Sequence, residues 1–198
     1  MKKILSLVMA LSLAVGGAAM AENVRDINVM NDADTLRLCE VTVPDGYSVS
    51  DTENGSGMYD YFLTPEDPES NVEYVCVSGS DRTAVEKLDS LRNTVNDLGN
   101  DVRMTDPTET EVQGHKAYIV SYTDSYYDAA VDPDAKIGEA VDTQQPNRFE
   151  QVFNAYIDAD GMHSVCLRVK CVSDSADAFV PDEDVAACTL SFADCLKF

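Results

Sequence analysis

The sequence predicts an α+β fold in which an antiparallel β-sheet is flanked by helices. Segments of alternating apolar and polar residues come in runs, which is typical of neighbouring strands in a meander. Short turns rich in Asp, Gly and Pro join these segments and favour antiparallel pairing. The helical patterns stand between and after the runs of strands, which argues against the alternating βαβ order of a parallel sheet.

Two turns separate the expected strands in the first half of the chain. One is the Pro-Asp-Gly turn at 44–46, and the other covers residues 65–70. Between them, residues 58–64 alternate, with two tyrosines and a leucine on one side, as a half-buried strand does. The strands expected here are residues 36–43, 47–49, 58–64 and 72–77.

One amphipathic helix follows these strands. Its start is expected at Ser80 or Asp81, either of which can cap a helix, and its end before Gly99. The predicted buried face recurs at steps of three and four residues: Val85, Leu88, Leu91, Val95 and Leu98. We expect this face to pack on the sheet.

The second half of the chain repeats the pattern of strands followed by a helix. A Gln113-Gly114 turn and a hairpin turn at 158–161 each join two strands. The strands expected here are residues 108–112, 116–123, 149–157 and 163–170. An acidic first turn at Pro181 then indicates a helix with its body at 185–192.

The N-terminus is typical of an exported protein. Lys2 and Lys3 precede an apolar stretch at 4–15, and the chain then offers a small-x-small cleavage sequence that ends at Ala21. We therefore predict a signal peptide at 1–21 that is cleaved after Ala21, placing the mature protein in the periplasm, the cell envelope or the extracellular space. No second apolar run in the sequence is long enough to span a membrane.

The mature chain is expected to be one domain with two irregular parts. Residues 22–34 are polar and predict a loose lead-in, and residues 35–198 hold the α+β domain. Residues 124–147 form a long acidic insertion between two strands. Loops of this length are usually functional or mobile, so the insertion is the expected working surface.

The charge of the chain is strongly acidic. The chain has 14 basic and 36 acidic residues, and loss of the two signal-peptide lysines leaves 12 minus 36, or −24. Nucleic acids and anionic lipid surfaces bind through Lys and Arg, so this balance argues against both. A basic protein or peptide, or another envelope component, fits the charge as a partner.

Six cysteines remain after cleavage, and an even number in an exported chain predicts disulfides. They are Cys39, Cys76, Cys166, Cys171, Cys188 and Cys195. Six cysteines allow about 15 pairings, which the sequence does not rank. Zinc binding is the alternative, but the spacings lack the two- to four-residue steps usual in structural zinc sites.

Calcium is the one cofactor that the sequence suggests, because exported acidic loops supply the oxygen ligands that calcium prefers. The candidate ligands crowd the insertion: Asp124, Asp128, Asp132, Asp134 and Glu139. Counted from Asp128, the register of an EF-hand fails, since Pro133 stands where the turn glycine belongs. An irregular calcium site or a solvated acidic loop remain as the two readings.

Several short segments carry a resemblance to a known family. They are Val43-Pro44-Asp45-Gly46-Tyr47, the helix at 80–98, Gly114-His115-Lys116-Ala117-Tyr118, Gln151-Val152-Phe153 and Ser191-Phe192. In this order the chain resembles exported bacterial members of the PsbP/DcrB-like superfamily. The resemblance implies an antiparallel sheet flanked by helices in a sandwich, and an accessory, binding or assembly role without shared catalytic residues. The cysteines and the insertion depart from the family pattern.

We therefore expect a non-catalytic, disulfide-stabilised binding or accessory domain. The Gly-x-Ser-x-Gly sequence of serine hydrolases is absent. An extracellular hydrolase built from His115 or His163 and a neighbouring carboxylate is the first alternative. A calcium-binding structural protein is the second.

Overall fold

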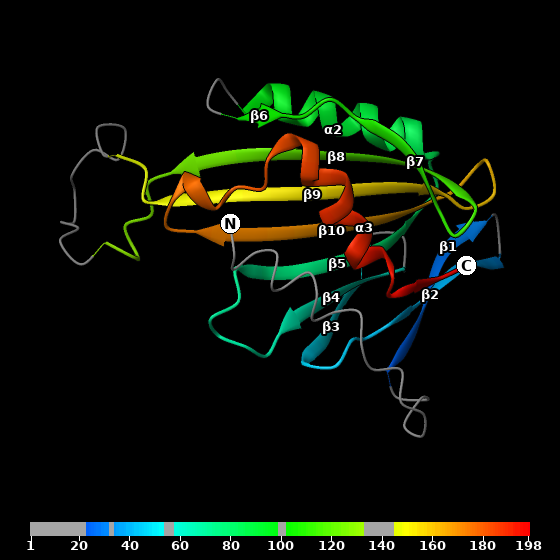
Figure 1. Cartoon of the computed structure of the whole chain (residues 1–198). Coiled ribbons are helices and arrows are strands. Elements are labelled where there is room, and N and C mark those ends of the chain that lie inside the picture. Colours follow the sequence, from blue (N-terminus) through cyan, green and yellow to red (C-terminus); the bar gives the residue numbers. More distant parts are fainter. Residues whose placement is uncertain (1–22, 32–33, 54–57, 99–101, 133–144) are drawn as a thin grey trace.

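The computed structural model describes residues 23–31, 34–53, 58–98, 102–132 and 145–198 (Figure 1). Within these residues, eight strands form one antiparallel sheet in the order β3-β4-β5-β10-β9-β8-β6, with β7 also paired to β8. Its strands are β3 (Tyr47–Glu53), β4 (Tyr59–Pro65), β5 (Val72–Ser80), β6 (Arg103–Met104), β7 (Thr108–Val112), β8 (His115–Tyr126), β9 (Arg148–Asp158) and β10 (Ser164–Ser173). The predicted antiparallel α+β class is confirmed.

The two longer helices pack against opposite faces of β8, β9 and β10. Side chains alternate between the two faces of a strand. Val120 of β8 packs with helix α2 (Ala84–Leu98). The preceding residue, Ile119, packs in the core that contains helix α3 (Val185–Ala193). Figure 1 shows α3 crossing in front of these strands and α2 along the top of the view, above β8. These central strands are therefore covered on both sides.

A smaller sheet contains strands from both ends of the described chain. Strand β2 (Asp34–Thr42) lies between β1 (Val24–Asn31) and β11 (Leu196–Lys197), antiparallel to both. The loose lead-in expected at 22–34 therefore contains a strand. Ile27 and Val29 explain the difference, because they are buried although Asp and Asn residues surround them in the sequence. The short apolar alternation was too sparse to stand out.

Helix α2 begins later than expected. Thr83, rather than Ser80 or Asp81, forms a capping box, since the Thr83 N–H donates to Glu86 Oε2 at 2.9 Å and the Glu86 N–H donates to Thr83 Oγ1 at 3.3 Å. Leu88, Leu91 and Val95 are buried as expected, but in the first turn Ala84 is buried and Val85 is 44% exposed. The expected position of Val85 on the packed face is wrong, and Gly99 lies outside the described residues.

The other predicted elements are found with shifted ends. Gln113 and Gly114 have φ angles of 52° and 85°, as a two-residue hairpin turn between β7 and β8 requires. Strand β8 continues to Tyr126, so Asp124 belongs to a strand and not to the insertion. The last helix ends at Ala193, which leaves Cys195 beyond it. No helix in the described parts of the chain is long and apolar enough to cross a bilayer.

The contact between the two sheets leaves no room for a side chain at Gly79 of β5. A Cβ atom built at Gly79 would lie 2.5 Å from the backbone oxygen of Asn28 in β1. We expect Gly79→Ala to force the sheets apart and to lower the free energy of unfolding by about 1–3 kcal/mol, the usual cost of overpacking. Urea unfolding measures the loss. The neighbouring Ser78→Ala, on the other face of β5, is the control, and equal effects of the two would contradict this account.

Candidate binding pocket

A pocket of about 400 Å³ lies between the larger sheet and the chain that leads into α3. Its floor comes from one end of β9 and β10, and its cover from residues 178–192, which include two short 3₁₀ helices, η2 (Ala176–Ala178) and η3 (Asp182–Asp184), just before α3. The lining is mostly apolar: Val72, Phe149, Phe153, Cys171, Val172, Ala178, Phe179, Val180, Cys188 and Phe192. Four polar residues complete it: Glu69, Asn71, Gln151 and Ser173.

Residues 176–184, which we call the strap, are held to the sheet by Gln151 of β9. The Val180 N–H donates to Gln151 Oε1 at 2.7 Å, and Gln151 Nε2 donates to the Val180 oxygen at 3.0 Å. The backbone N–H can only donate, so these partners also fix the orientation of the Gln151 amide. Gln151 is 4% exposed, and its two hydrogen bonds place the strap over the pocket.

Two further contacts hold the strap on either side of Val180. The rings of Phe149 in β9 and Phe179 lie edge to face, with centroids 6.3 Å apart. Arg103 of β6 forms an ion pair with Asp182 at 2.6 Å, although both side chains are largely exposed and the pair adds little stability. The phenylalanine contact closes one wall of the pocket and keeps its interior apolar.

A second, smaller cavity of about 170 Å³ lies along the strap. Gln151, Phe179 and Val180 line both cavities, so the Gln151–Val180 hydrogen bonds stand between them. Ser121 of β8 also lines the smaller cavity, and its fully buried Oγ has no hydrogen-bond partner among the described residues. A ligand hydroxyl or carbonyl in this cavity could supply the missing partner.

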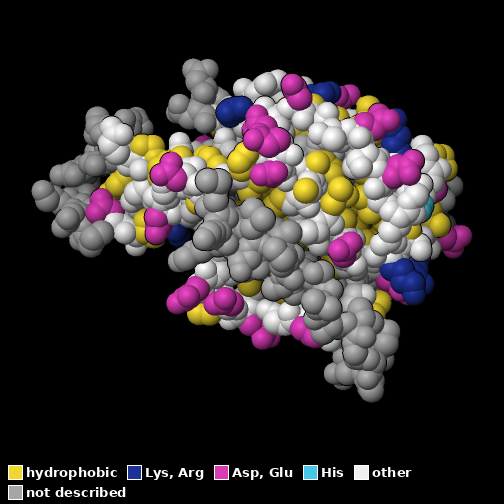
Figure 2. Space-filling model, in the orientation of Figure 1, with side chains coloured by type: hydrophobic (Ala, Val, Ile, Leu, Met, Phe, Trp, Pro, Cys, Tyr) yellow, Lys and Arg dark blue, Asp and Glu magenta, His cyan; other side chains and the backbone are white. Residues whose placement is uncertain are grey.

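The border of the larger pocket is acidic. Glu69 belongs to its lining, and the nearby chain from 174 to 184 carries five acidic residues, of which Asp182 pairs with Arg103 and Asp174 lies 3.8 Å from Arg148. Acidic side chains are spread over this side of the molecule, and basic ones are few (Figure 2). An apolar interior with an acidic border suits a ligand that combines an apolar group with a positive charge.

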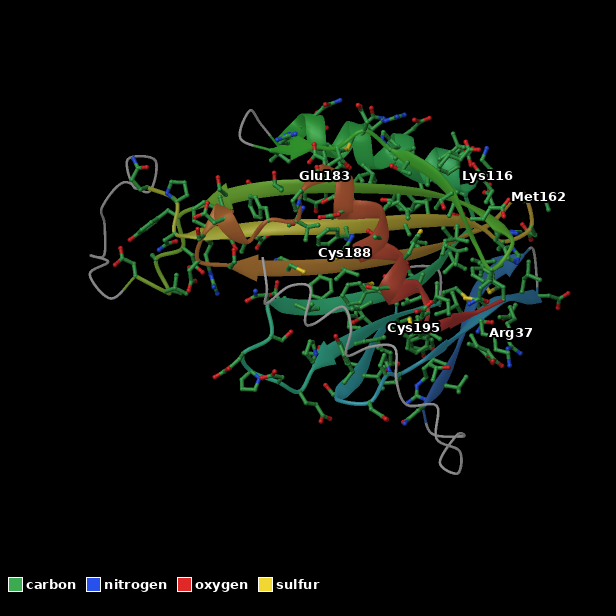
Figure 3. The ribbon with its side chains drawn as sticks, viewed as in Figure 1. Arg37, Lys116, Met162, Glu183, Cys188 and Cys195 are labelled. Carbon is green, nitrogen blue, oxygen red and sulfur yellow. The ribbon has the colours of Figure 1, made fainter. Side chains whose placement is uncertain are left out.

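Two thiols line this pocket, Cys171 from β10 and Cys188 from α3. Figure 3 labels Cys188 on α3. Burial and the neighbouring Cys188 thiol raise the pKa of Cys171 to about 12. Burial and the Asp184 carboxylate raise the pKa of Cys188 to about 11. Both thiols are therefore protonated at neutral pH, and neither is an activated nucleophile in this state.

The acidic residues considered for calcium do not meet in the described part of the chain. The Asp124 side chain accepts a hydrogen bond from the Ser125 N–H at 2.7 Å, and Asp132 Oδ2 accepts one from the Tyr127 hydroxyl at 2.5 Å. Asp128 lies 3.8 Å from Arg148. No group of three or more His, Cys, Asp or Glu side chains arranged for a metal occurs in the ranges described above. Asp134 and Glu139 lie outside those ranges, as does half of the insertion.

The two histidines both contact the β9–β10 hairpin turn, away from the pocket. His115 Nδ1 lies 2.9 Å from the backbone oxygen of Asp158, and its ring stacks on Phe198. His163 is 7% exposed, and its Nδ1 lies 2.7 Å from Asp160 Oδ2. Neither histidine lines either cavity. The His163–Asp160 pair exists, but its hydrogen bonds stabilise the hairpin turn.

Sequence reasoning missed the residues that form the pocket. The sequence places Gln151 in an expected strand and in a segment of family resemblance, and the strap before an expected helix, but neither pattern predicts a pocket. One signal was available: Gln151 is a polar residue at the start of a strand whose following residues are almost all apolar. Such a residue must find a hydrogen-bond partner once it is buried, although the sequence does not say where.

Among protein families, curated sequences and solved structures, only solved structures proved similar to the chain. No protein-family model matches the chain, and no curated protein sequence matches it. The chain is similar to the solution structure of cyanobacterial PsbP (CyanoP) from Synechocystis, with 14% identity, a TM-score of 0.46, and 93% of this chain and 97% of that chain covered. It is also similar to LpqN, described as involved in cell envelope biogenesis of Mycobacterium tuberculosis, with 11% identity, a TM-score of 0.45, and coverages of 88% and 90%. A PsbP protein is thus among the structures that this chain is similar to, as the sequence resemblance suggested.

Replacing Gln151 should release the strap. Gln151→Ala leaves the Val180 N–H and C=O without their partners, so we expect a loss of about 1–3 kcal/mol in stability. The Val180 amide should also lose protection in hydrogen exchange. The exposed Gln145 provides a matched control as Gln145→Ala. Unchanged exchange at Val180 in the Gln151 variant would show that the strap is held by other contacts.

The hairpin turn should contribute stability that depends on pH. Partial burial pushes the pKa of Asp160 up, but hydrogen bonds from the His163 ring and from the amides of Met162 and His163 outweigh it and leave the pKa below the ordinary 3.8. A lowered pKa stabilises the fold above the unfolded value, and the effect is lost as the pH falls through the folded value.

Asp160→Asn should therefore cost about 1 kcal/mol near neutral pH, the worth of a hydrogen bond, and progressively less below about pH 4. Urea unfolding of both proteins across this range measures the difference. A stability gap that stays constant down to about pH 2 would contradict the assigned role of the charge.

Proposed function

We propose that the protein is an exported, non-catalytic binding domain whose pocket takes an apolar group from a positively charged protein or peptide. The observation that carries the proposal is the apolar pocket of about 400 Å³ with Glu69 in its wall and the five acidic residues of the 174–184 segment near it. A volume of this size fits one or two large side chains.

The chemistry of the lining supports binding rather than catalysis. The pocket lining contains no histidine, and its two thiols have raised pKa values. Its one carboxylate, Glu69, comes from an exposed turn between β4 and β5. Such a carboxylate can attract a cation without binding it tightly, so the apolar contacts supply most of the affinity and the acidic border supplies orientation.

Export supports the choice of partner. The signal sequence predicted at 1–21 directs the chain out of the cytoplasm, and six cysteines in an exported chain favour disulfides that stabilise the domain there. The net charge of −24 expected for the mature chain, 12 minus 36, disfavours anionic polymers and favours basic polypeptides. The pocket replaces the insertion at 124–147 as the surface that we propose for binding.

A labelled peptide of alternating Leu and Lys is a suitable first probe, with Leu-Glu and Ser-Lys peptides for comparison. We expect the Leu-Lys peptide alone to bind, and its affinity to fall as NaCl is raised from about 0.05 to about 0.5 M. Fluorescence anisotropy gives the Kd. Equal binding of the Leu-Glu peptide would contradict the role of the acidic border.

Two pairs of variants locate the site. Ala178→Phe fills the pocket and should weaken binding at least about tenfold, or about 1.4 kcal/mol, whereas Ala176→Phe, on the exposed side of η2, should not. Glu69→Gln should weaken binding a few-fold, and Glu66→Gln, which is exposed outside the lining, should leave it unchanged. Binding that survives Ala178→Phe would move the site elsewhere.

A further inference from the structure

The larger sheet divides the six cysteines into a group of two and a group of four. Cys76 of β5 stands between Val75 and Val77, which both point into the core around α3, so Cys76 points to the opposite face. Cys166 of β10 lies on that same face, packed with Leu88 of α2. The remaining cysteines belong to the core around α3 or pack against it: Cys39, Cys171, Cys188 and Cys195.

We propose that Cys76 and Cys166 form one disulfide on the α2 face, and that the other four cysteines form two disulfides on the opposite face. Those two are Cys171–Cys188 and Cys39–Cys195. The pairing goes beyond the proposed binding function and does not depend on it.

The division follows from the reach of a disulfide. Bridged cysteines have Cα atoms about 4.4–6.8 Å apart and Cβ atoms that point toward each other. Two cysteines on opposite faces of one sheet point apart, with the paired backbone between them. A bridge through the sheet is therefore excluded, and the roughly 15 pairings that six cysteines allow fall to the three that join Cys76 to Cys166.

The register of β5 and β10 brings Cys76 and Cys166 to diagonal positions. Cys76 lies opposite Arg168, and Cys166 lies opposite Ser78. Diagonal Cα atoms are about 7–8 Å apart, a little beyond the usual span of a disulfide. All six cysteines are unbridged in the structure, so closing this bridge requires the two strands to approach slightly. The pKa of Cys76 is raised to about 12, mainly by burial and then by the Asp60 carboxylate. The Cys166 thiol makes a smaller contribution in the same direction, because it lies nearby.

On the other face, the positions of Cys171 and Cys188 in the pocket lining favour one of the three remaining pairings. Cys171 and Cys188 both line it, from the end of β10 and from α3. This leaves Cys39 of β2 and Cys195, which precedes the neighbouring strand β11. The Thr42 N–H donates to the Cys195 oxygen at 2.8 Å, so Cys195 lies opposite Thr42. Thr42 is three residues beyond Cys39 in β2. Bridging them requires the chain after α3 to slide along β2.

Each bridge forms by thiol–disulfide exchange. Two thiols lose two protons and two electrons as their sulfur–sulfur bond forms, and the electrons reduce the disulfide of an exported dithiol–disulfide oxidoreductase to two thiols. The attacking species is a thiolate, which burial makes scarce in the folded chain. The exchange therefore has to take place while these strands are still exposed, during folding outside the cytoplasm.

Peptide mapping of the exported protein tests the pairing directly. The protein is unfolded without reductant in the presence of N-ethylmaleimide and digested with trypsin. Cleavage at Arg148 and Arg168 leaves Cys166 on a peptide with no other cysteine. A second protease that cleaves after Glu and Asp separates Cys39 from Cys76 at Glu40 and Glu73. The same protease cuts at Glu183 and Asp194, which separates the last three cysteines.

We expect the Cys166 peptide to be linked to the Cys76 peptide alone, and no cysteine to carry maleimide. A link from Cys166 to any of the other four, or maleimide on Cys76 and Cys166, would overturn the proposal. Linked pairs of Cys39 with Cys171 or Cys188 would overturn the assignment on the α3 face.

Variants give a second readout that does not require the intact set of bridges. Cys76→Ser should free one thiol, at Cys166, and Cys39→Ser should free one thiol, at Cys195. Maleimide labelling followed by mapping identifies the freed residue. Label at any other cysteine would contradict the pairing, and the Cys76→Ser/Cys166→Ser double variant should carry no label at all.

Discussion

From Gln151 to Ile157, every residue of strand β9 is buried, because helix α2 covers one face of the strand and the chain around α3 covers the other. A polar side chain on such a strand cannot reach water to form its hydrogen bonds. Gln151 and Asn154 are the polar residues in this run. Both atoms of the Gln151 amide pair with Val180, whereas Asn154 is only half satisfied: Arg168 Nε donates to its Oδ1 at 3.2 Å, and its buried Nδ2 has no partner among the described residues. The place of the strap, and with it the pocket, follows from the need to satisfy Gln151.

On the face of β9 that helix α2 covers, the position of the helix depends on the β9–β10 hairpin. Asp158 Oδ1 accepts a hydrogen bond from the Ala84 N–H at the start of α2, at 3.1 Å, and the Ser164 hydroxyl donates to the Arg82 oxygen at 2.7 Å. The hairpin turn therefore fixes where α2 begins, and an acceptor at a helix N-terminus satisfies a backbone donor that would otherwise be unpaired. Both covers of β9 are thus positioned by residues of β9 or of its turn.

Local features of the fold were predictable from the sequence, and contacts between distant segments were not. The Gln113-Gly114 turn and the strands beside it were found because turn chemistry and alternation are local. The capping box at Thr83 was missed because Ser80 and Asp81 offer equally good caps, and only packing against the sheet decides among them. Strand β1 was missed because Ile27 and Val29 are too few to show a period. The pocket was missed because the Gln151–Val180 contact joins residues 29 positions apart.

The pairing of β2 with β11 has a consequence for the order of folding. Strand β2 lies near the start of the described chain and β11 at residues 196–197, so the small sheet cannot be completed until nearly the whole described chain is available for pairing. Contacts between segments so far apart in the chain form slowly, because the entropy of closing a long loop is lost before the favourable contacts form. Until then the core side chains of β2 stay open to solvent. Until β11 joins the small sheet, β2 therefore depends on β1 alone for strand pairing.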